Sequence, residues 1–299
     1  MTRVAAVDLG TNSTRLLVAD VADSRLDEVA RRLEITRLGE GVDAGGCLLP
    51  TAIDRVRACL DDYRLLIDEL GAERGLAIAT SAVRDAENGP AFLDEIEQSY
   101  GLATRLLSGD EEAFLTFTGV TAGRTLSAAT LIVDIGGGST ELILGGPDGV
   151  ERHTSLDLGC VRLTERVLAS DPPQARELEE CARLVRSLLP GWPSPGDAIG
   201  VAGTVTTLAA LDLGLAVYDP ERIHGHRMRA TAVEMQLRRL AALPVAERRR
   251  VPGLEPERAP VIVAGAIILR EVLAHFSVPE MEASERDILD GAALLASDL

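Results

Sequence analysis

Two loops of this chain combine an aspartate, glycines and hydroxyl side chains directly after an apolar strand. They are Asp8-Leu9-Gly10-Thr11-Asn12-Ser13 and Asp134-Ile135-Gly136-Gly137-Gly138-Ser139-Thr140. Successive glycines let neighbouring backbone N–H groups turn toward one point and form an anion-binding nest, and the hydroxyl groups add further donors. We therefore predict that both loops bind phosphate, through Gly10, Thr11, Asn12, Ser13, Gly136, Gly137, Gly138, Ser139 and Thr140.

An ordinary hairpin turn is the alternative for each loop. Three consecutive glycines with flanking hydroxyl groups exceed what a two-residue turn requires. A dinucleotide-binding fingerprint is disfavoured because the strand-like segment 141–144 follows the glycines, where that fingerprint needs a helix. Asp134, at the end of an apolar strand, is placed to hold a divalent cation or its water shell. A third loop, with Gly203 and Thr204, leads into a helix, and it is either a phosphate site or a plain helix cap.

Acidic side chains open a predicted helix at Gly109-Asp110-Glu111-Glu112. The helix macrodipole stabilises negative charge there, which is one explanation of the pattern. The other is catalytic, because an ionised carboxylate that faces a phosphate can accept a proton from an attacking water. Arg84 follows directly on a predicted strand, and its guanidinium group suits either a phosphoryl oxygen or a surface ion pair with Asp85 or Glu87.

Hydrophobic periodicity predicts the elements that position these loops. Each aspartate loop joins two apolar strands into a hairpin, over residues 4–19 and 130–144, and the repeat indicates duplicated halves. Strands and helices alternate elsewhere, which is typical of an α/β fold. The predicted strands are 76–80 and 102–107, a strand and helix share 198–211, and the predicted helices are 50–70, 90–100, 110–118, 163–169, 174–189, 231–243, 261–276 and one after 285.

Composition narrows the class of protein. The chain has 299 residues and a net charge of −17, which argues against general binding to nucleic acid or a membrane surface. All 30 basic residues are arginines, so Schiff-base chemistry and a Walker A lysine are excluded. Four scattered cysteines and no signal peptide indicate a reduced, cytoplasmic protein.

Positive charge is concentrated in one segment, residues 222–258. Nine arginines and four acidic residues give this arginine island a net charge of +5. It is either a contact surface for a polyanion or a solvated basic helix face, and both interpretations stay open.

Six motifs resemble those of the exopolyphosphatase and guanosine pentaphosphate phosphohydrolase (Ppx/GppA) family and occur in the family's order along the chain. They are the two aspartate loops and four further segments, 80–86, 108–113, 158–165 and 200–205, and the resemblance extends to 284–291. It implies an α/β fold of the actin-like, ribonuclease H-like (ASKHA) class, with two domains and an interdomain cleft. We expect domains over 1–123 and 124–299, with the last helix, 285–299, packing back on the first.

The resemblance also implies roles for individual side chains. Glu112 carries over as the base that activates water, Arg84 as the phosphate clamp, and Glu141 as a third catalytic residue. Asp134, Glu141 and Asp8 carry over as metal ligands, and Gly203 and Thr204 as further phosphate-binding residues. The implied cofactor is Mg²⁺ or Mn²⁺, alone or with a monovalent cation.

The function predicted on these grounds is Mg²⁺-dependent release of terminal phosphate from inorganic polyphosphate. The chain looks like the short, two-domain form of the family, so we expect a preference for shorter polymers. A pppGpp 5′-phosphohydrolase, a non-catalytic (p)ppGpp sensor and an ASKHA kinase are the alternatives. We expect a cytoplasmic homodimer that binds neither nucleic acid nor membranes.

Overall fold

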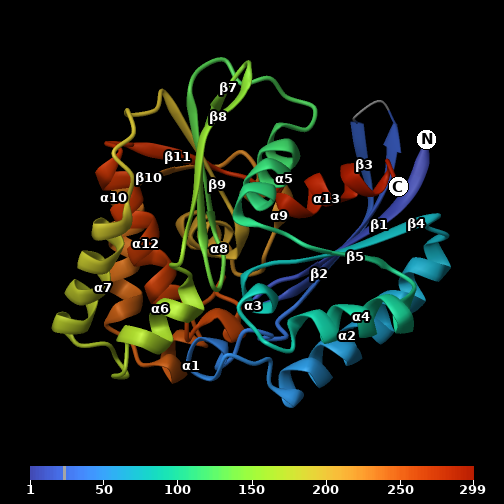
Figure 1. Cartoon of the computed structure of the whole chain (residues 1–299). Helices are drawn as coiled ribbons and strands as arrows, with labels where there is room; N and C mark the ends of the chain where they lie inside the picture. The colour runs from blue at the N-terminus through green and yellow to red at the C-terminus, as the bar shows by residue number, and fades with distance from the viewer. Residues whose placement is uncertain (23–24) are drawn as a thin grey trace. The chain divides into compact units, whose positions relative to one another are not determined.

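The computed structural model describes residues 1–22 and 25–299 (Figure 1). They form two compact units, and each is described by itself. Unit 1 comprises Met1–Thr125 and Arg286–Leu299, and unit 2 comprises Leu126–Glu285. None of the helices in the described ranges combines the length and apolar character that crossing a bilayer requires.

Unit 1 is built on a five-stranded sheet in the order β3-β2-β1-β4-β5. The first three strands in the chain are antiparallel, whereas β4 runs parallel to β1 and β5 runs parallel to β4. The strands are β1 (Thr2–Leu9), β2 (Thr14–Ala22), β3 (Arg25–Glu34), β4 (Arg74–Ala79) and β5 (Ala103–Leu106).

Both faces of the sheet in unit 1 are covered. Alternate side chains of β1 enter two different cores: Ala5 and Val7 pack with the α2 and α4 side chains, and Val4 and Ala6 pack with those of α13. This burial on both faces explains why β1 is a continuous apolar run. The helices are α1 (Val42–Gly45), α2 (Pro50–Leu70), α3 (Ser81–Arg84), α4 (Gly89–Tyr100), α5 (Gly109–Thr121) and α13 (Ile288–Ala296).

Helices α5 and α13 lie side by side in unit 1 (Figure 1). A Cβ atom on Gly119 would lie 1.9 Å from the Asp287 carbonyl oxygen, and one on Gly291 would lie 2.0 Å from the Leu115 carbonyl oxygen. Only glycine permits backbones to approach so closely. The two helices are therefore held in one relative position by backbone contact.

Unit 2 repeats the plan with a six-stranded sheet in the order β10-β11-β9-β6-β7-β8. Strands β6, β7 and β8 are antiparallel, β9 runs parallel to β6, β11 runs parallel to β9, and β10 is antiparallel to β11. The strands are β6 (Thr130–Ile135), β7 (Thr140–Gly146), β8 (Gly149–Leu156), β9 (Asp197–Val201), β10 (Arg227–Arg229) and β11 (Glu280–Ala283).

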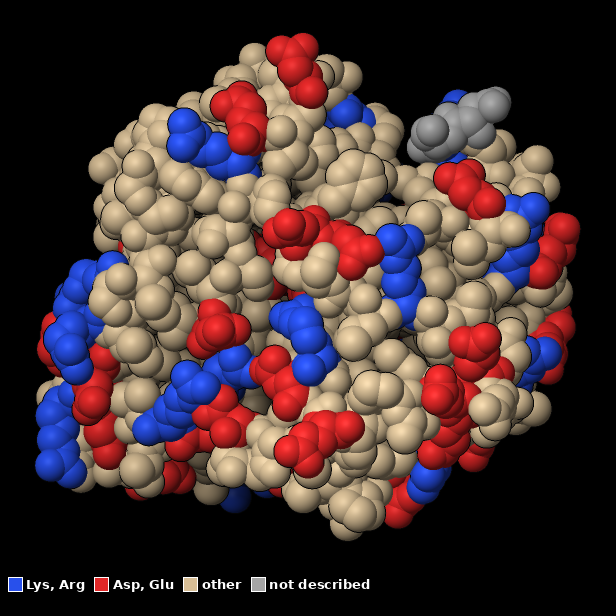
Figure 2. Space-filling model, in the orientation of Figure 1, with Lys and Arg blue, Asp and Glu red and all other residues tan. Residues whose placement is uncertain are grey.

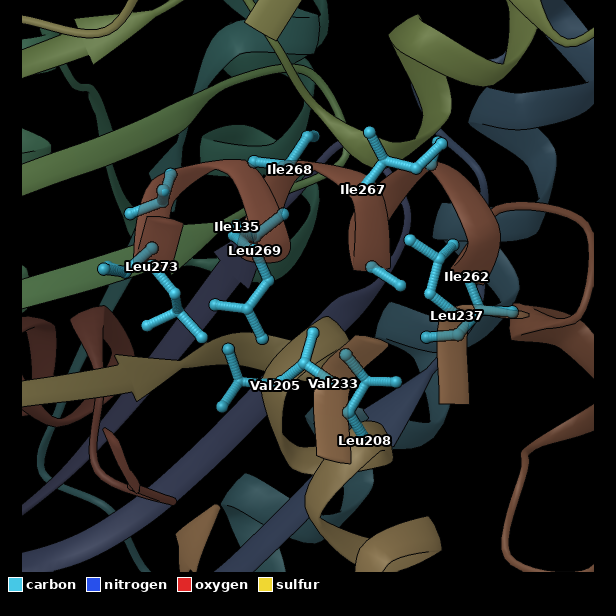
Figure 3. Packing of buried hydrophobic residues seen from close by; sticks show 14 of the residues in the cluster. Ile135, Val205, Leu208, Val233, Leu237, Ile262, Ile267, Ile268, Leu269 and Leu273 are labelled. Atoms are coloured by element: carbon cyan, nitrogen blue, oxygen red, sulfur yellow. The ribbon is translucent and has the colours of Figure 1, made fainter. Parts of the chain in front are cut away.

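The core of unit 2 is centred on α12 (Ile262–His275), whose side chains are buried along most of its length. Figure 3 shows Ile262 to Leu273 of this helix beside Val205 and Leu208 of α8 and Val233 of α10. The other helical segments are α6 (Cys160–Val167), α7 (Ala175–Leu188), α8 (Ala202–Asp212), α9 (Pro220–Ile223), α10 (Ala230–Ala241), α11 (Val245–Arg248) and η1 (Pro256–Arg258).

The predicted α/β class is confirmed in both units. In each, an antiparallel three-stranded meander continues into parallel strands, which is the ribonuclease H-like arrangement expected of the ASKHA class. The helix predicted over 50–70 has those bounds, because Pro50 is its first residue and Gly71 ends it in the left-handed conformation. The helix predicted around 163–169 is present, but it begins three residues earlier, at Cys160, where its first amides bind the second aspartate loop.

Candidate active site

The two aspartate loops fold into the same turn. In loop 1 (residues 8–13) the amide of Gly10 donates to the carbonyl of Ser13, with 3.0 Å between the nitrogen and the oxygen. In loop 2 (residues 134–140) the amide of Gly136 donates to the carbonyl of Ser139, also at 3.0 Å. The repeat predicted from the sequence is therefore a repeat of backbone geometry as well.

Neighbouring segments occupy the carbonyl groups of loop 1. The Thr11 carbonyl accepts from the amide of Gly39 at 2.8 Å, and the Asn12 carbonyl accepts from the amide of Arg37 at 2.9 Å. These carbonyls are turned toward residues 37–39. The loop is thus fixed from one side while its amides remain available.

Loop 2 is fixed in the same way by the start of α6. The Gly136 carbonyl accepts from the amide of Cys160 at 3.0 Å, and the Gly137 carbonyl accepts from the amide of Val161 at 2.9 Å. A Cβ atom on Gly159 would lie 2.1 Å from the Gly137 carbonyl oxygen, so only glycine fits there. The N-terminal amides of α6 bind the loop itself and are not left for a ligand.

The remaining amides of both loops are the groups predicted to bind phosphate, and that role stays a prediction. Across residues 1–22 and 25–299, no backbone carbonyl group accepts a hydrogen bond from the amides at 11–13 or 137–139. In loop 1 two side-chain atoms are also buried without a partner, Oδ1 of Asp8 and Nδ2 of Asn12. A buried polar group without a partner costs about 1–3 kcal/mol, so these atoms indicate a place for a polar ligand.

The residue opposite the aspartate differs between the loops. Asp8 on β1 pairs in register with Arg15 on β2, and its Oδ2 accepts from Arg15 Nε at 2.9 Å and Nη2 at 2.6 Å. Burial raises the pKa of Asp8, and the charge of Arg15 offsets part of this rise. In unit 2 the equivalent pair consists of two carboxylates, Asp134 on β6 and Glu141 on β7.

The chemistry of the Asp134 and Glu141 pair suits a divalent cation. Both residues are buried, and Ser155 Oγ donates to Glu141 Oε1 at 2.9 Å. Two carboxylates directly opposite each other on a sheet repel. Across the described residues, no group of three or more His, Cys, Asp or Glu side chains could hold a metal. Mg²⁺ nevertheless fits a two-carboxylate site, because it is often bound by one or two carboxylates with substrate phosphates and water.

Of the three carboxylates that open α5, each has a different environment. Asp110 is exposed, and Glu111 closes a capping box in which its Oε2 accepts from the backbone amide of Ser108 at 2.8 Å. That bond, with help from the Arg105 guanidinium and the Ser108 hydroxyl, lowers the pKa of Glu111 to about 2. Glu112 alone is buried, with 3% of the residue exposed.

Arg84 and Glu112 are brought together, as their predicted roles require. Arg84, the last residue of α3, donates from Nη1 to Glu112 Oε1 at 2.5 Å and to the Leu107 carbonyl at 2.7 Å. The first residue of α3, Ser81, exchanges a hydrogen bond of 3.0 Å with the Thr11 hydroxyl. Helix α3 thus connects loop 1 to the Arg84 and Glu112 pair. The sequence analysis did not predict the contact between Ser81 and loop 1.

The hydroxyl groups of two predicted phosphate-binding residues are directed into the protein. Thr140 is fully buried and donates to the Leu158 carbonyl at 2.6 Å. Thr204 is 4% exposed. The Thr204 side chain forms a hydrogen bond with the Cys160 thiol inside the protein. Burial raises the pKa of that thiol to about 11, and the hydrogen bond partly offsets this rise.

Arg258 packs on Gly203. A Cβ atom there would lie 1.8 Å from Arg258 Nη1, and the same guanidinium group bonds to Glu255 at 2.5 Å. The guanidinium group is the far end of a flexible side chain, so this contact does not by itself require a glycine. A role for Gly203 in phosphate binding stays a prediction.

The arginine island is not one continuous cationic surface. Arg248 is buried and donates to the carbonyls of Leu243 and Ala259, at 3.0 and 2.8 Å. Arg227 is neutralised by Asp197 and Glu280. On the face shown in Figure 2, basic side chains lie among acidic ones. A net charge of +5 in the sequence thus overstates the positive charge available to a polyanion.

The duplicated α/β plan, with an aspartate loop of the same turn in each unit, defines a protein of the actin-like fold class. The family model of the Ppx/GppA phosphatase family matches residues 17–294, and this chain belongs to that family. It is 42% identical to exopolyphosphatase 2 of Mycobacterium tuberculosis, over 98% of both chains.

Solved structures agree with this assignment. The Ppx/GppA family member from Aquifex aeolicus matches with a TM-score of 0.82 and 32% identity, covering 99% of this chain and 97% of that one. An exopolyphosphatase from Cytophaga hutchinsonii matches with a TM-score of 0.88 and 25% identity, covering 97% of this chain and 96% of that one. The family and fold class predicted from the sequence are therefore confirmed.

Proposed function

We propose that this protein is an exopolyphosphatase, a phosphoanhydride hydrolase that releases terminal phosphate from inorganic polyphosphate. The observation that carries the proposal is the aspartate loop of each unit, whose amides at 11–13 and 137–139 bond to no backbone carbonyl group, because such loops suit phosphate groups. The similarity to exopolyphosphatase 2 of Mycobacterium tuberculosis over nearly the whole chain supports it.

In the proposed reaction, water attacks the terminal phosphorus in line with the bridging oxygen. A new P–O bond forms to the water oxygen, the bond to the bridging oxygen breaks, and Glu112 accepts the proton of the water. Arg84, which is already beside Glu112, donates to a phosphoryl oxygen and stabilises its charge. The backbone amides of loops 1 and 2 orient the phosphates.

Asp134 and Glu141 are the residues we propose to hold the metal. When bound, Mg²⁺, or Mn²⁺ in its place, would neutralise charge on the phosphate oxygens. The register of the two carboxylates and the Ser155 hydrogen bond orient the pair for this role. Four further properties stay predictions. Native mass spectrometry tests the homodimer, and cell fractionation tests the cytoplasmic location. Crystallography tests the interdomain cleft, and a series of polyphosphate lengths tests the preference for shorter chains.

Replacement of Glu112 by Gln tests the proposed function. Gln has nearly the same shape but cannot accept the proton, so we expect phosphate release from polyphosphate to fall about 10²–10⁴-fold. Glu111→Gln is the matched control, since the side chain is next in the sequence but serves the capping box, and its rate should change less than threefold.

The assay offers polyphosphate of several lengths, pppGpp and ATP, each with Mg²⁺, and measures released phosphate. Faster turnover of pppGpp than of any polyphosphate would identify the nucleotide as the substrate instead. Tight binding without turnover would identify a sensor. Activity of Glu112→Gln near that of the wild type would remove Glu112 from the mechanism.

A further inference from the structure

A buried arginine joins loop 1 to the last helix of the chain. The guanidinium group of Arg15 lies between two carboxylates: Nε and Nη2 donate to Asp8 Oδ2, and Nη1 donates to Asp287 Oδ2. The Arg15 side chain is 15% exposed, and those of Asp8 and Asp287 are 7% and 5% exposed. In such surroundings a guanidinium group with fixed, planar donors holds its partners in one orientation.

Asp287 is itself fixed on both sides. It caps α13, and its Oδ1 accepts from the amide of Leu289 at 2.9 Å. Its amide donates to Asp290 Oδ2 at 3.1 Å, and both oxygens of Asp290 accept from Arg31 Nη2 at 3.1 Å. The carboxylate that holds Arg15 therefore cannot rotate without breaking the start of the helix.

The same helix pair also carries the proposed base. Helix α13 contacts α5 through Gly119 and Gly291, where the backbones touch, and α5 begins with the turn that contains Glu112. One rigid assembly thus sets the position of Asp287 and of Glu112. A network that served only to stabilise the fold would not need to end on a loop residue with an unsatisfied oxygen.

The unsatisfied atoms of loop 1 indicate what Arg15 achieves. Asp8 Oδ1 is an acceptor without a donor, and Asn12 Nδ2 is a donor without an acceptor, although both are buried in the same turn. A buried polar group is normally hydrogen-bonded, so both atoms are available to a ligand. Arg15 holds the other oxygen of Asp8, Oδ2, and so fixes the direction in which Oδ1 points.

We propose that Arg15 is a positioning residue that is held by Asp287 and keeps the Asp8 carboxylate open toward the substrate. This inference rests on the proposed function, since the ligand is the terminal phosphate and its attacking water. Asp8 Oδ1 accepts from that water, and Asn12 Nδ2 donates to a phosphate oxygen. Arg15 supplies at Asp8 the positive charge that a metal supplies at Asp134 and Glu141, so Asp8 does not bind the metal.

The test compares Arg15→Gln and Asp287→Asn with Arg31→Gln, which breaks an ion pair of the same network without touching Arg15. Asn is as good a helix cap as Asp, so Asp287→Asn keeps α13 and remains informative if Arg15→Gln does not fold. We expect both variants to lower kcat for polyphosphate about 10–100-fold with KM within threefold of the wild type. Arg31→Gln should lower the melting temperature with kcat within threefold.

Two readouts do not depend on turnover. Mn²⁺ binding, measured by electron paramagnetic resonance, should be unchanged within threefold in Arg15→Gln and lost in Glu141→Gln. The side-chain amide signal of Asn12 in NMR spectra should shift in Arg15→Gln and Asp287→Asn, because the Asp8 carboxylate of the same loop loses its fixed orientation, and not in Arg31→Gln.

An unchanged kcat together with an unchanged Asn12 signal would overturn the proposal, because Arg15 would then be merely structural. Loss of Mn²⁺ binding in Arg15→Gln would also overturn it. If the wild type releases phosphate from no substrate, the proposed function fails, and the Asn12 signal alone then decides for or against the role of Arg15.

Discussion

The two aspartate loops share a backbone turn but differ in the residue opposite the aspartate. Each is closed by the same glycine-to-serine hydrogen bond at 3.0 Å. Opposite the aspartate, however, unit 1 has Arg15 and unit 2 has Glu141, in the same register. A duplicated turn can thus keep its backbone geometry while a positive side chain faces the aspartate in one copy and a second carboxylate faces it in the other.

The loops also differ in the contacts that they make with the glycines packed against them. A Cβ atom on Gly39 would lie 2.2 Å from the Cγ2 atom of Thr11, which is a side-chain contact. A Cβ atom on Gly159 would lie 2.1 Å from the carbonyl oxygen of Gly137, which is a backbone contact. A side chain can rotate away and a backbone cannot, so we expect loop 2 to tolerate less change than loop 1.

Glu141→Arg should give the largest effect, because it gives loop 2 the residue of loop 1. The new guanidinium group would form an ion pair with Asp134, as Arg15 does with Asp8. We therefore expect loss of Mn²⁺ binding and at least a 10²-fold loss of phosphate release. Titration by electron paramagnetic resonance and a phosphate assay measure the two effects. Glu151→Arg, at an exposed position of β8, is the matched control with the same change of charge. Normal Mn²⁺ binding in Glu141→Arg would refute the difference that we draw between the loops.

Gly159→Ala and Gly39→Ala compare the supports of the loops. Overpacking against a backbone costs about 1–3 kcal/mol, so Gly159→Ala should lower the melting temperature by several degrees. Gly39→Ala should cost less, because the atoms nearest to its Cβ belong to the side chains of Thr11 and Ala82 and not to the backbone. Differential scanning calorimetry measures both, with Gly191→Ala as control, since nothing lies within 4 Å of a Cβ atom there. Equal losses for the two loop variants would contradict the distinction between side-chain and backbone support.

Sequence periodicity predicted most buried elements and missed the exposed ones. The helix over 50–70 and the two hairpins have strong apolar patterns and formed as expected. Strands β3 and β8, the third strand of each meander, were missed, because most of their side chains are exposed or half-buried and leave no apolar run. β10 and β11 were missed because three or four residues are too few for a pattern.

The candidate site was predictable to the level of its loops but not of its partners. A glycine-hydroxyl motif specifies a turn, and the order of motifs specifies the family. The contact between Arg15 and Asp287, by contrast, joins positions 272 residues apart, and no local pattern encodes it. The register of Asp8 with Arg15 was readable in principle, since a tight hairpin turn fixes which residues face each other. Likewise, no local pattern indicates that Arg258 packs on Gly203.

Glu111→Gln should give the smallest effect. It tests a difference between the N-termini of helices α6 and α5. The first amides of α6 bind loop 2, whereas α5 is capped by its own Ser108 and Glu111. The folded-state pKa of Glu111, about 2, lies below the ordinary value of 4.5, so its charge stabilises the fold above pH 4.5 and this contribution is lost as the pH falls toward 2. Because the side chain is 37% exposed, solvent screens the charge and we expect only about 0.5 kcal/mol.

Urea unfolding of wild type and Glu111→Gln between pH 3 and pH 7 measures this difference. Gln retains the shape and hydrogen-bonding capacity of the capping box, so the comparison isolates the charge. The two unfolding curves should differ at pH 7 and converge toward pH 3, while phosphate release at pH 7 stays within threefold. A difference that does not depend on pH would mean that the Glu111 charge does not stabilise α5. A large loss of phosphate release would instead mean that Glu111, like Glu112, belongs to the chemistry of the site, and that the start of α5 is more than a helix cap.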